Sequence, residues 1–152
     1  MNTLKIFSIA FLSSVTLGFA QDVNQARKAV DAEQYEKAKS ILKSIIKVNP
    51  IDGRANFILG NVYLIQTVTD SAKISFQRGL AGTEGSRLNY IGLGTIDLDN
   101  GNTTAAEANF ALALKDTKKK DIEELVAIGR AYTYSNKPNY KKAIEYLNKA
   151  KA

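Results

Sequence analysis

A repeat of 34 residues constrains the fold of this chain more than any other feature of its sequence. Alanine recurs at this spacing, at Ala38, Ala72 and Ala106. A large apolar residue follows each alanine four positions later, at Leu42, Phe76 and Phe110. Residues four positions apart share one face of a helix, so each pair marks a buried helical face. The repeat therefore predicts a stack of similar helical units.

The segment before each of these helices carries a small residue at a matching position: Ala26, Gly60, Gly94 and Gly129. Larger residues flank this column, at Leu59, Leu93, Ile128, Tyr63 and Tyr132. A small residue lets a neighbouring helix approach closely, and a large residue fills the space beside it. Each unit is therefore expected to be an αα-hairpin that buries its apolar face only by stacking on the next unit.

Helical periodicity and end signals indicate eight helices, at 22–32, 35–48, 53–66, 69–80, 87–100, 103–115, 121–134 and 138–151. Pro50 ends the second helix, because proline cannot continue one. Two pairs fit capping boxes, Thr104 with Glu107 and Asp121 with Glu124. The sequence shows no strand pattern, so the expected fold class is all-α.

The best-preserved unit reads Asn-Phe-Ile-Leu-Gly-Asn-Val-Tyr from Asn56 to Tyr63 and continues with Ala72, Phe76 and Gly79-Leu80. With the 34-residue spacing, these positions resemble the tetratricopeptide repeat (TPR) family. The resemblance covers nearly all of 21–152 and implies an αα-hairpin superhelix of about four repeats, at 21–51, 52–85, 86–120 and 121–152. In the fourth unit the spacing from the glycine to the alanine is two residues longer, which we assign to the turn at 135–139.

The resemblance also implies which residues pack the repeats together: Ala26, Ala38, Leu59, Gly60, Tyr63, Ala72, Phe76, Leu93, Gly94, Ala106, Phe110, Gly129, Tyr132 and Ala143. It says little about specific function, because this repeat serves as an interaction scaffold in many settings. What it implies is a protein or peptide partner, with no catalysis, no cofactor and no metal.

In TPR proteins the first helices of the repeats line a concave groove. The resemblance places there Val23, Arg27, Val30, Phe57, Asn61, Leu64, Ile91, Thr95, Leu98, Val126, Arg130 and Thr133. One column, Arg27, Asn61, Thr95 and Arg130, would form a polar ladder for the backbone or carboxylates of an extended peptide. A second set, Phe57, Leu64, Ile91 and Leu98, would supply apolar pockets or, alternatively, pack between neighbouring helices.

The chaperone-binding branch of the family holds a carboxylate with Lys, Asn and Arg side chains. The corresponding positions here are Val23, Arg27, Ile58, Leu88 and Gly92. Only Arg27 could serve, so a chaperone-tail adaptor is excluded.

Composition restricts the chemistry of the chain, which contains no Cys, no His and no Trp. Disulfides, Cys–His and Ser–His–Asp catalytic sites, and zinc sites of thiolates or imidazoles are therefore excluded within it. Asp97 and Asp99 are two positions apart on a helix, so they point to different sides and cannot act together on one bond. A carboxylate-dependent hydrolase is only a remote alternative, and we expect no enzyme.

Residues 1–20 have the pattern of a secretory signal peptide. Lys5 supplies a positive start, a mostly apolar run follows at 6–19, and small residues at positions 18 and 20 mark a cleavage site before Gln21. The alternative, an uncleaved membrane anchor, would need roughly 20 apolar residues. We expect an exported bacterial protein of the periplasm or outer envelope, with no transmembrane segment in the mature chain.

A basic loop at 115–120 offers an alternative function, the binding of an anionic glycan or lipid headgroup together with Arg130. The net charge is only +6, and the loop could equally be solvated. Nucleic acid is not an expected partner, because no stacking aromatics or recognition motif accompany the lysines. At the C-terminus, Ile144, Leu147 and Ala150 have no following repeat to cover them, which predicts self-association or a continuing stack through this face.

Overall fold

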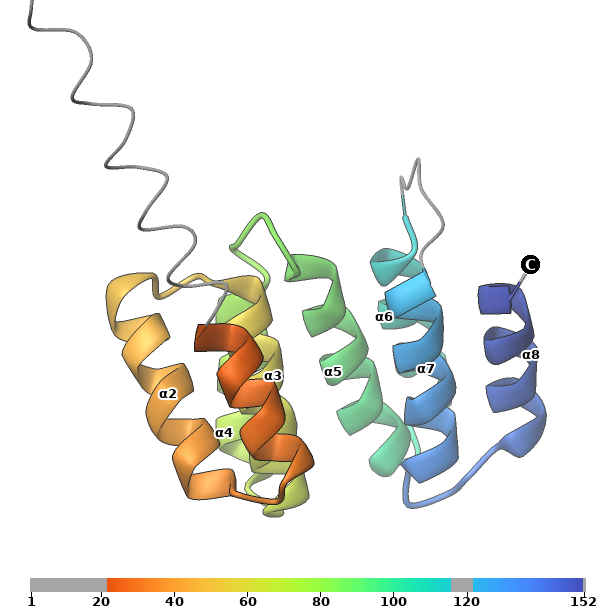
Figure 1. Cartoon of the computed structure of the whole chain (residues 1–152). Helices are drawn as coiled ribbons and strands as arrows, with labels where there is room; N and C mark the ends of the chain where they lie inside the picture. Colours follow the sequence, from red (N-terminus) through yellow and green to blue (C-terminus); the bar gives the residue numbers. More distant parts are fainter. Residues whose placement is uncertain (1–21, 116–121, 152) are drawn as a thin grey trace, which may run out of the picture.

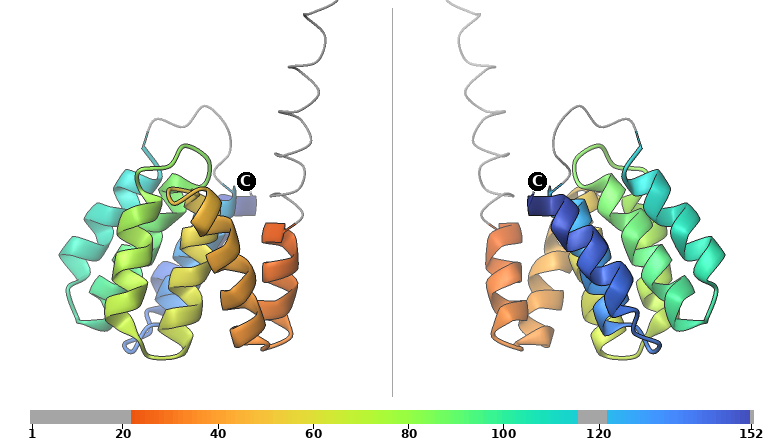
Figure 2. Two further views of the ribbon diagram at one scale, coloured as in Figure 1. Left: turned by 90° about the vertical axis from the view of Figure 1, so that its left-hand side faces the viewer. Right: turned by 90° about the vertical axis from the view of Figure 1, so that its right-hand side faces the viewer.

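The computed structural model describes residues 22–115 and 122–151, which form eight helices and no strand (Figure 1). A first helix at 22–31 is followed by α2 (Tyr35–Val48), α3 (Gly53–Ile65), α4 (Thr69–Gly79), α5 (Ser86–Asp99), α6 (Thr103–Ala113), α7 (Ile122–Tyr134) and α8 (Tyr140–Lys151). Consecutive helices pair into hairpins that stack along a curved path (Figure 2). The predicted all-α solenoid is confirmed. The predicted signal peptide at 1–20, the cleavage point before Gln21 and the loop residues 116–120 lie outside the described residues.

The longer turn of the fourth hairpin lies where the sequence predicts it, at 135–139. The backbone N–H of Asn139 donates to the carbonyl of Tyr132 at 2.9 Å. The side-chain oxygen of Asn139 accepts from the backbone N–H of Lys142 at 3.1 Å. This side chain therefore caps α8, which begins at Tyr140 rather than at position 138.

The capping box predicted at Thr104 is wrong. Thr104 lies inside α6, and Asn102, which precedes the helix, makes no side-chain cap bond. A carboxylate cap occurs instead at α3, where Asp52 accepts from the backbone N–H of Ala55 at 2.8 Å. Asp121, from the second predicted box, lies outside the described residues.

The small residues of the repeat are buried where helices meet. The ring of Phe76 lies against the backbone of Gly60 in α3 and of Gly92 in α5, so one side chain sets the spacing between two repeats. The ring of Phe110 takes the equivalent place beside Gly94. Gly92 is a packing residue that the 34-residue period does not reveal, because it stands two positions before the column of Gly94.

Most of the residues implied by the family resemblance to pack the repeats together are buried, namely Ala26, Ala38, Leu59, Gly60, Ala72, Phe76, Gly94, Ala106, Phe110, Gly129, Tyr132 and Ala143. Tyr63 and Leu93 are only half-buried. In the C-terminal half the Tyr132 ring meets Phe110 edge-on, with centroids 5.4 Å apart. It also stacks on Tyr146 at 5.9 Å, which ties α6, α7 and α8 together through aromatic contact.

The C-terminal face differs in part from the prediction. Leu147 turns inward and packs against Gly129 of α7, so it does not belong to an uncovered apolar stripe. Ile144 is 58% exposed and Ala150 is half-buried. Self-association or a continuing stack through this face stays a prediction.

Candidate interaction groove

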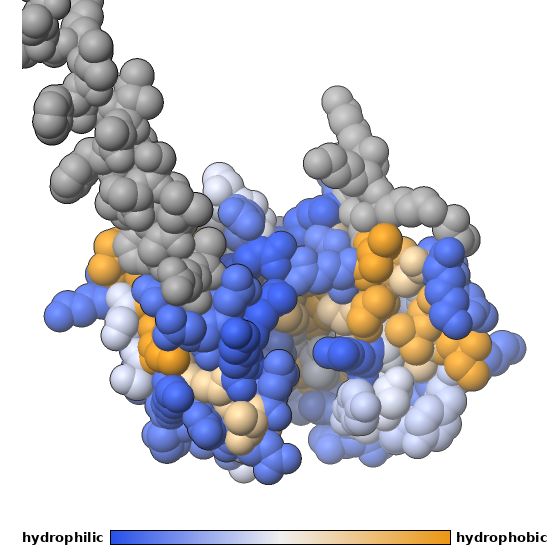
Figure 3. Space-filling model, viewed as in Figure 1, coloured by the Kyte–Doolittle hydropathy of each residue, from blue (hydrophilic) through white to orange (hydrophobic). Residues whose placement is uncertain are grey.

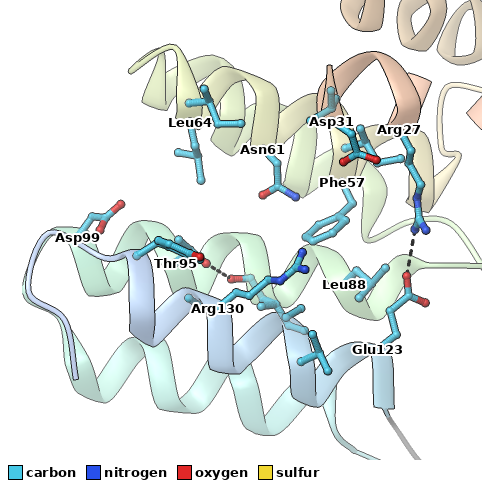
Figure 4. A pocket seen from close by; sticks show the side chains of 18 of the residues that line it. Arg27, Asp31, Phe57, Asn61, Leu64, Leu88, Thr95, Asp99, Glu123 and Arg130 are labelled. Carbon is cyan, nitrogen blue, oxygen red and sulfur yellow. Dashed lines mark hydrogen bonds and ion pairs between the residues drawn. The ribbon is translucent and has the colours of Figure 1, made fainter. Parts of the chain in front are cut away.

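A cavity of about 1140 Å³ lies on the concave side of the stack, lined by the helix at 22–31, α3, α5 and α7 (Figure 4). These are the first helices of all four hairpins. In Figure 3 the surface is hollowed between the N-terminal and C-terminal repeats, and apolar side chains gather over α7 and α8. The predicted groove residues that line it are Arg27, Val30, Phe57, Asn61, Leu64, Ile91, Thr95, Val126 and Arg130. We call this surface the concave groove.

Leu98 does not line the concave groove, contrary to prediction. It is buried in a cluster that includes Phe110 and Tyr132. The alternative reading, that such apolar residues pack between helices, holds for this position. Ile91 belongs to both the groove and the core, because it lines the groove yet its side chain is only 2% exposed.

The predicted polar ladder is not continuous. The hydroxyl of Thr95 donates to the carbonyl of Ile91 in its own helix at 2.9 Å, and Arg27 is held in an ion pair. Asn61 and Arg130 make no side-chain hydrogen bond or ion pair with another described residue. Of the four column members, these two are therefore free to meet a ligand.

An ion cluster joins the first, second and fourth repeats at one end of the groove. Glu123 of α7 accepts from Arg27 at 3.0 Å and from both terminal nitrogens of Arg54 at 2.8 and 2.9 Å. Arg54 also pairs with Glu84 at 3.3 Å. The dashed line in Figure 4 shows the Arg27–Glu123 bond reaching across the cavity. Sequence spacing could not reveal this cluster, because its partners are 96 and 69 positions apart.

The same cluster shifts two pKa values in the directions that favour charge. Hydrogen bonds from Arg54 are the main cause that lowers the pKa of Glu123, with Arg27 adding to the effect. The hydrogen bond to Glu123 likewise raises the pKa of Arg54. Both groups are therefore fully ionised at neutral pH, and the two arginines are already neutralised in part by the protein itself.

Among the described residues, the unpaired side chains of the groove combine apolar walls with one cation, Arg130. Phe57 and Leu64 are half-buried, while Ile65 is 52% and Tyr134 is 81% exposed. In Figure 4 the Arg130 side chain extends into the cavity toward Phe57. Exposed aromatic and aliphatic side chains beside an arginine are typical of the centre of a protein-binding surface.

Several groove residues escaped the sequence-based prediction: Asp31, Ile58, Ile65, Leu88, Asp99, Ile122, Glu123, Ala127, Ala131, Tyr134 and Asn136. Many of them, such as Ile65, Asp99 and Tyr134, stand one residue after a predicted groove position. The family pattern marks one narrow stripe on each first helix, whereas the curved stack exposes a wider face. A rule that counts both neighbours on the helix would have found these residues, but not Leu88, Ile122, Glu123 or Asn136.

Asp97 and Asp99, the two aspartates weighed from the sequence, make separate hydrogen bonds in the structure. In the described parts of the chain, no group of three or more His, Cys, Asp or Glu side chains is placed to hold a metal ion. Asp97 accepts a hydrogen bond from Asn109 at 2.8 Å. Asp99 accepts from the backbone N–H of Asn136 at 2.9 Å, so each carboxylate is engaged separately.

A comparison with models of known families finds a match in the C-terminal part of the chain. A family model for the tetratricopeptide repeat matches residues 127–152, which include most of α7 and all of α8. This segment is similar to the tetratricopeptide repeat. The predicted TPR resemblance is thus confirmed, with the direct match at the fourth unit.

A solved structure has a similar fold over most of the chain. This structure, the crystal structure of MamA, aligns with 93% of this chain and 81% of its own, with a TM-score of 0.56 and 20% identity. At that identity the likeness concerns the fold alone. No curated protein matches the chain in sequence. None of the described helices is long and apolar enough to cross a membrane.

Proposed function

We propose that this TPR chain is a non-enzymatic scaffold that binds a segment of a partner protein in the concave groove. The observation that carries the proposal is that the first helices of all four hairpins line one cavity of about 1140 Å³. An α-helix with its side chains is about 10–12 Å across, and an extended strand is narrower, so a single peptide segment suits such a cavity.

The free side chains indicate how a segment would be held. Ile65 and Tyr134 offer exposed apolar surface that a partner would cover. Arg130 and Asn61 have unused hydrogen-bonding capacity. The partner segment should therefore carry apolar residues together with a carboxylate or backbone carbonyls that reach Arg130.

We also propose that the chain acts outside the cytoplasm, in the periplasm or at the outer envelope of a bacterium. This rests on the signal-peptide pattern of residues 1–20 alone. The basic loop at 115–120 remains an alternative anion site, and nearly all of it lies outside the described residues.

The test is a comparison of three immobilised forms of the chain. The groove variant carries Ile65→Ala and Tyr134→Ala. The matched control carries Val48→Ala and Leu112→Ala, which are 66% and 44% exposed on second helices and do not line the groove. Proteins captured from envelope extract are identified by mass spectrometry, and the purified partner is then titrated by calorimetry.

We expect the wild type and the control to bind the same partner with equal affinity. The groove variant should bind at least about tenfold more weakly, the size of loss expected when buried aromatic contacts are removed. Equal binding by all three forms would place the interaction on another surface and contradict the proposal.

A further inference from the structure

A second, smaller depression lies between α2 and α4, with α3 beneath it. Its volume is about 320 Å³ and it shares no lining residue with the concave groove. Both walls are second helices of their hairpins, so it opens on the outer side of the stack. The proposed partner binding in the groove neither uses nor explains this site. We call it the α2–α4 pocket, and it is lined by Lys43, Ile46, Lys47, Leu59, Tyr63, Ser71, Ile74, Ser75 and Arg78.

Three cations stand around the α2–α4 pocket, and none of them is in an ion pair within the described parts of the chain. Lys43 and Lys47 are one turn apart on α2, and Arg78 comes from α4 on the opposite wall. None of the three forms an ion pair or side-chain hydrogen bond with another described residue. Neither Asp nor Glu is among the lining residues.

The neighbouring acid, Glu36, has only a weak charge interaction with one of them, Lys43, which is the smallest of the causes that shift its pKa. Glu36 lies further along α2, where Lys39 holds its carboxylate at 2.6 Å and Gln66 donates to it at 3.2 Å. The hydrogen bond from Lys39 is the largest cause that lowers the pKa of Glu36. Three like charges facing one depression repel each other, and an anion placed between them would relieve that repulsion.

The rest of the pocket is suited to an organic group with hydroxyls. Leu59 and Ile46 are buried beneath it, Tyr63 is half-buried, and Ile74 is 55% exposed at its edge. The hydroxyl of Ser75 donates to the carbonyl of Ser71 at 2.9 Å, which leaves its oxygen as an acceptor. The hydroxyl of Ser71 makes no hydrogen bond with another described residue and can donate to a ligand.

We propose that the α2–α4 pocket binds a phosphate ester. A phosphate monoester carries close to two negative charges at neutral pH, which matches three cations better than the single charge of a carboxylate. The planar fork of Arg78 can bind two phosphate oxygens at once, and the lysines supply point charges. At about 30 Å³ for each water, the pocket has room for about ten waters, more than a bare phosphate fills. The organic part would then lie against Tyr63 and Ile74.

The experiment uses the full chain and two probes of the same chemistry. The soluble probe is glycerol phosphate, titrated by calorimetry. The membrane probe is a vesicle of phosphatidic acid, whose headgroup is also a phosphate monoester, and phosphatidylcholine, compared with phosphatidylcholine alone in a sedimentation assay. Binding to the soluble ester indicates a free metabolite as ligand, and binding only to the anionic vesicle indicates a lipid headgroup; either outcome supports the proposal.

Two triple variants separate the pocket from general charge. The pocket variant carries Lys43→Gln, Lys47→Gln and Arg78→Gln. The control carries Lys28→Gln, Lys37→Gln and Lys141→Gln, all of which replace exposed residues outside the pocket. Glutamine keeps a similar side-chain length and helix propensity, so both variants should keep the helical circular dichroism of the wild type.

We expect the pocket variant to bind at least about tenfold more weakly and the control to bind within about twofold of the wild type. An equal loss in both variants would show that net charge alone attracts the probe, and would overturn the proposal. Absence of binding to both probes by the wild type would overturn it as well.

Discussion

Replacement of Gly94 by leucine should strongly destabilise the third repeat. A β-carbon added at Gly94 would lie 2.5 Å from Cε1, 2.9 Å from Cδ1 and 3.1 Å from Cζ of the Phe110 ring. Carbon atoms pack best at about 3.5–4.0 Å, so the first added atom alone requires α5 and α6 to separate by about 1 Å. Three further carbons of leucine would enter the same buried space, since Phe110 is 0% exposed.

The expected size of the effect follows from two opposing contributions. Overpacking of a core costs about 1–3 kcal/mol, and the contact with a ring held between helices places this change at the upper end. Leucine favours a helix over glycine by roughly 0.8 kcal/mol, which offsets part of the cost. The net loss should be about 2 kcal/mol, which lowers the Tm of a domain of this size by about 8 °C.

Thermal unfolding followed by circular dichroism measures the change. Ala111→Leu, which adds the same side chain at an exposed position of α6, is the matched control and should stay within about 0.5 kcal/mol of the wild type. A Gly94→Leu variant that melts within about 2 °C of the wild type would refute the packing described for Phe110.

A double-mutant cycle identifies the clashing partner. Gly94→Ala introduces only the β-carbon, and Phe110→Leu removes the ring that it would meet. The double variant should be more stable than the sum of the two single effects by about 0.5 kcal/mol or more. Additive effects would mean that the strain is relieved somewhere other than at the Phe110 ring.

The remaining predictions concern the ion cluster, the groove and the two ends of the chain. Glu123→Gln should lower the free energy of unfolding in urea by about 0.5–1 kcal/mol at pH 7, a modest value because the carboxylate is 42% exposed. Folding lowers the pKa of Glu123, so its contribution to stability is present above pH 4.5 and is lost as the pH falls through the pKa of the folded state. The wild type and Glu123→Gln should therefore unfold alike at pH 2. A difference in unfolding free energy that persists at pH 2 would contradict this role of Glu123. The double change Arg27→Ala and Arg130→Ala should weaken partner binding in calorimetry and leave the circular dichroism unchanged; unaltered affinity would move the site away from the groove. Intact-mass analysis of exported protein should show a chain that begins at Gln21, and a mass that retains residues 1–20 would refute cleavage there. If the face around Ile144 mediates self-association, light scattering should show a dimer or larger species that Ile144→Lys dissociates, whereas a monomeric wild type would refute it.

The sequence by itself determined the repeat architecture. An αα-hairpin needs small residues where its helices touch and a large residue beside them, and these needs recur at every repeat. The residues that recur at the positions of Gly94 and Phe110 in each repeat therefore predict both where the helices lie and which of their faces are buried. The resemblance to the TPR family implied that the first helices would share a surface, and most of the predicted groove residues do line one cavity.

The tertiary structure decided how far the stack curves and which charges meet as a result. Arg27 and Glu123 are 96 positions apart and belong to different repeats, so no local pattern couples them. The curvature of the stack brings them within 3.0 Å, and among the described residues that line the groove it leaves Arg130 as a cation without an ion pair. Leu98 shows the same limit. Its periodicity fits both a groove wall and a core, and the packing of α5 against α6 and α7 buries it. Helical periodicity specifies which face of a helix is apolar, whereas the packing angles that accumulate over four repeats decide what that face meets.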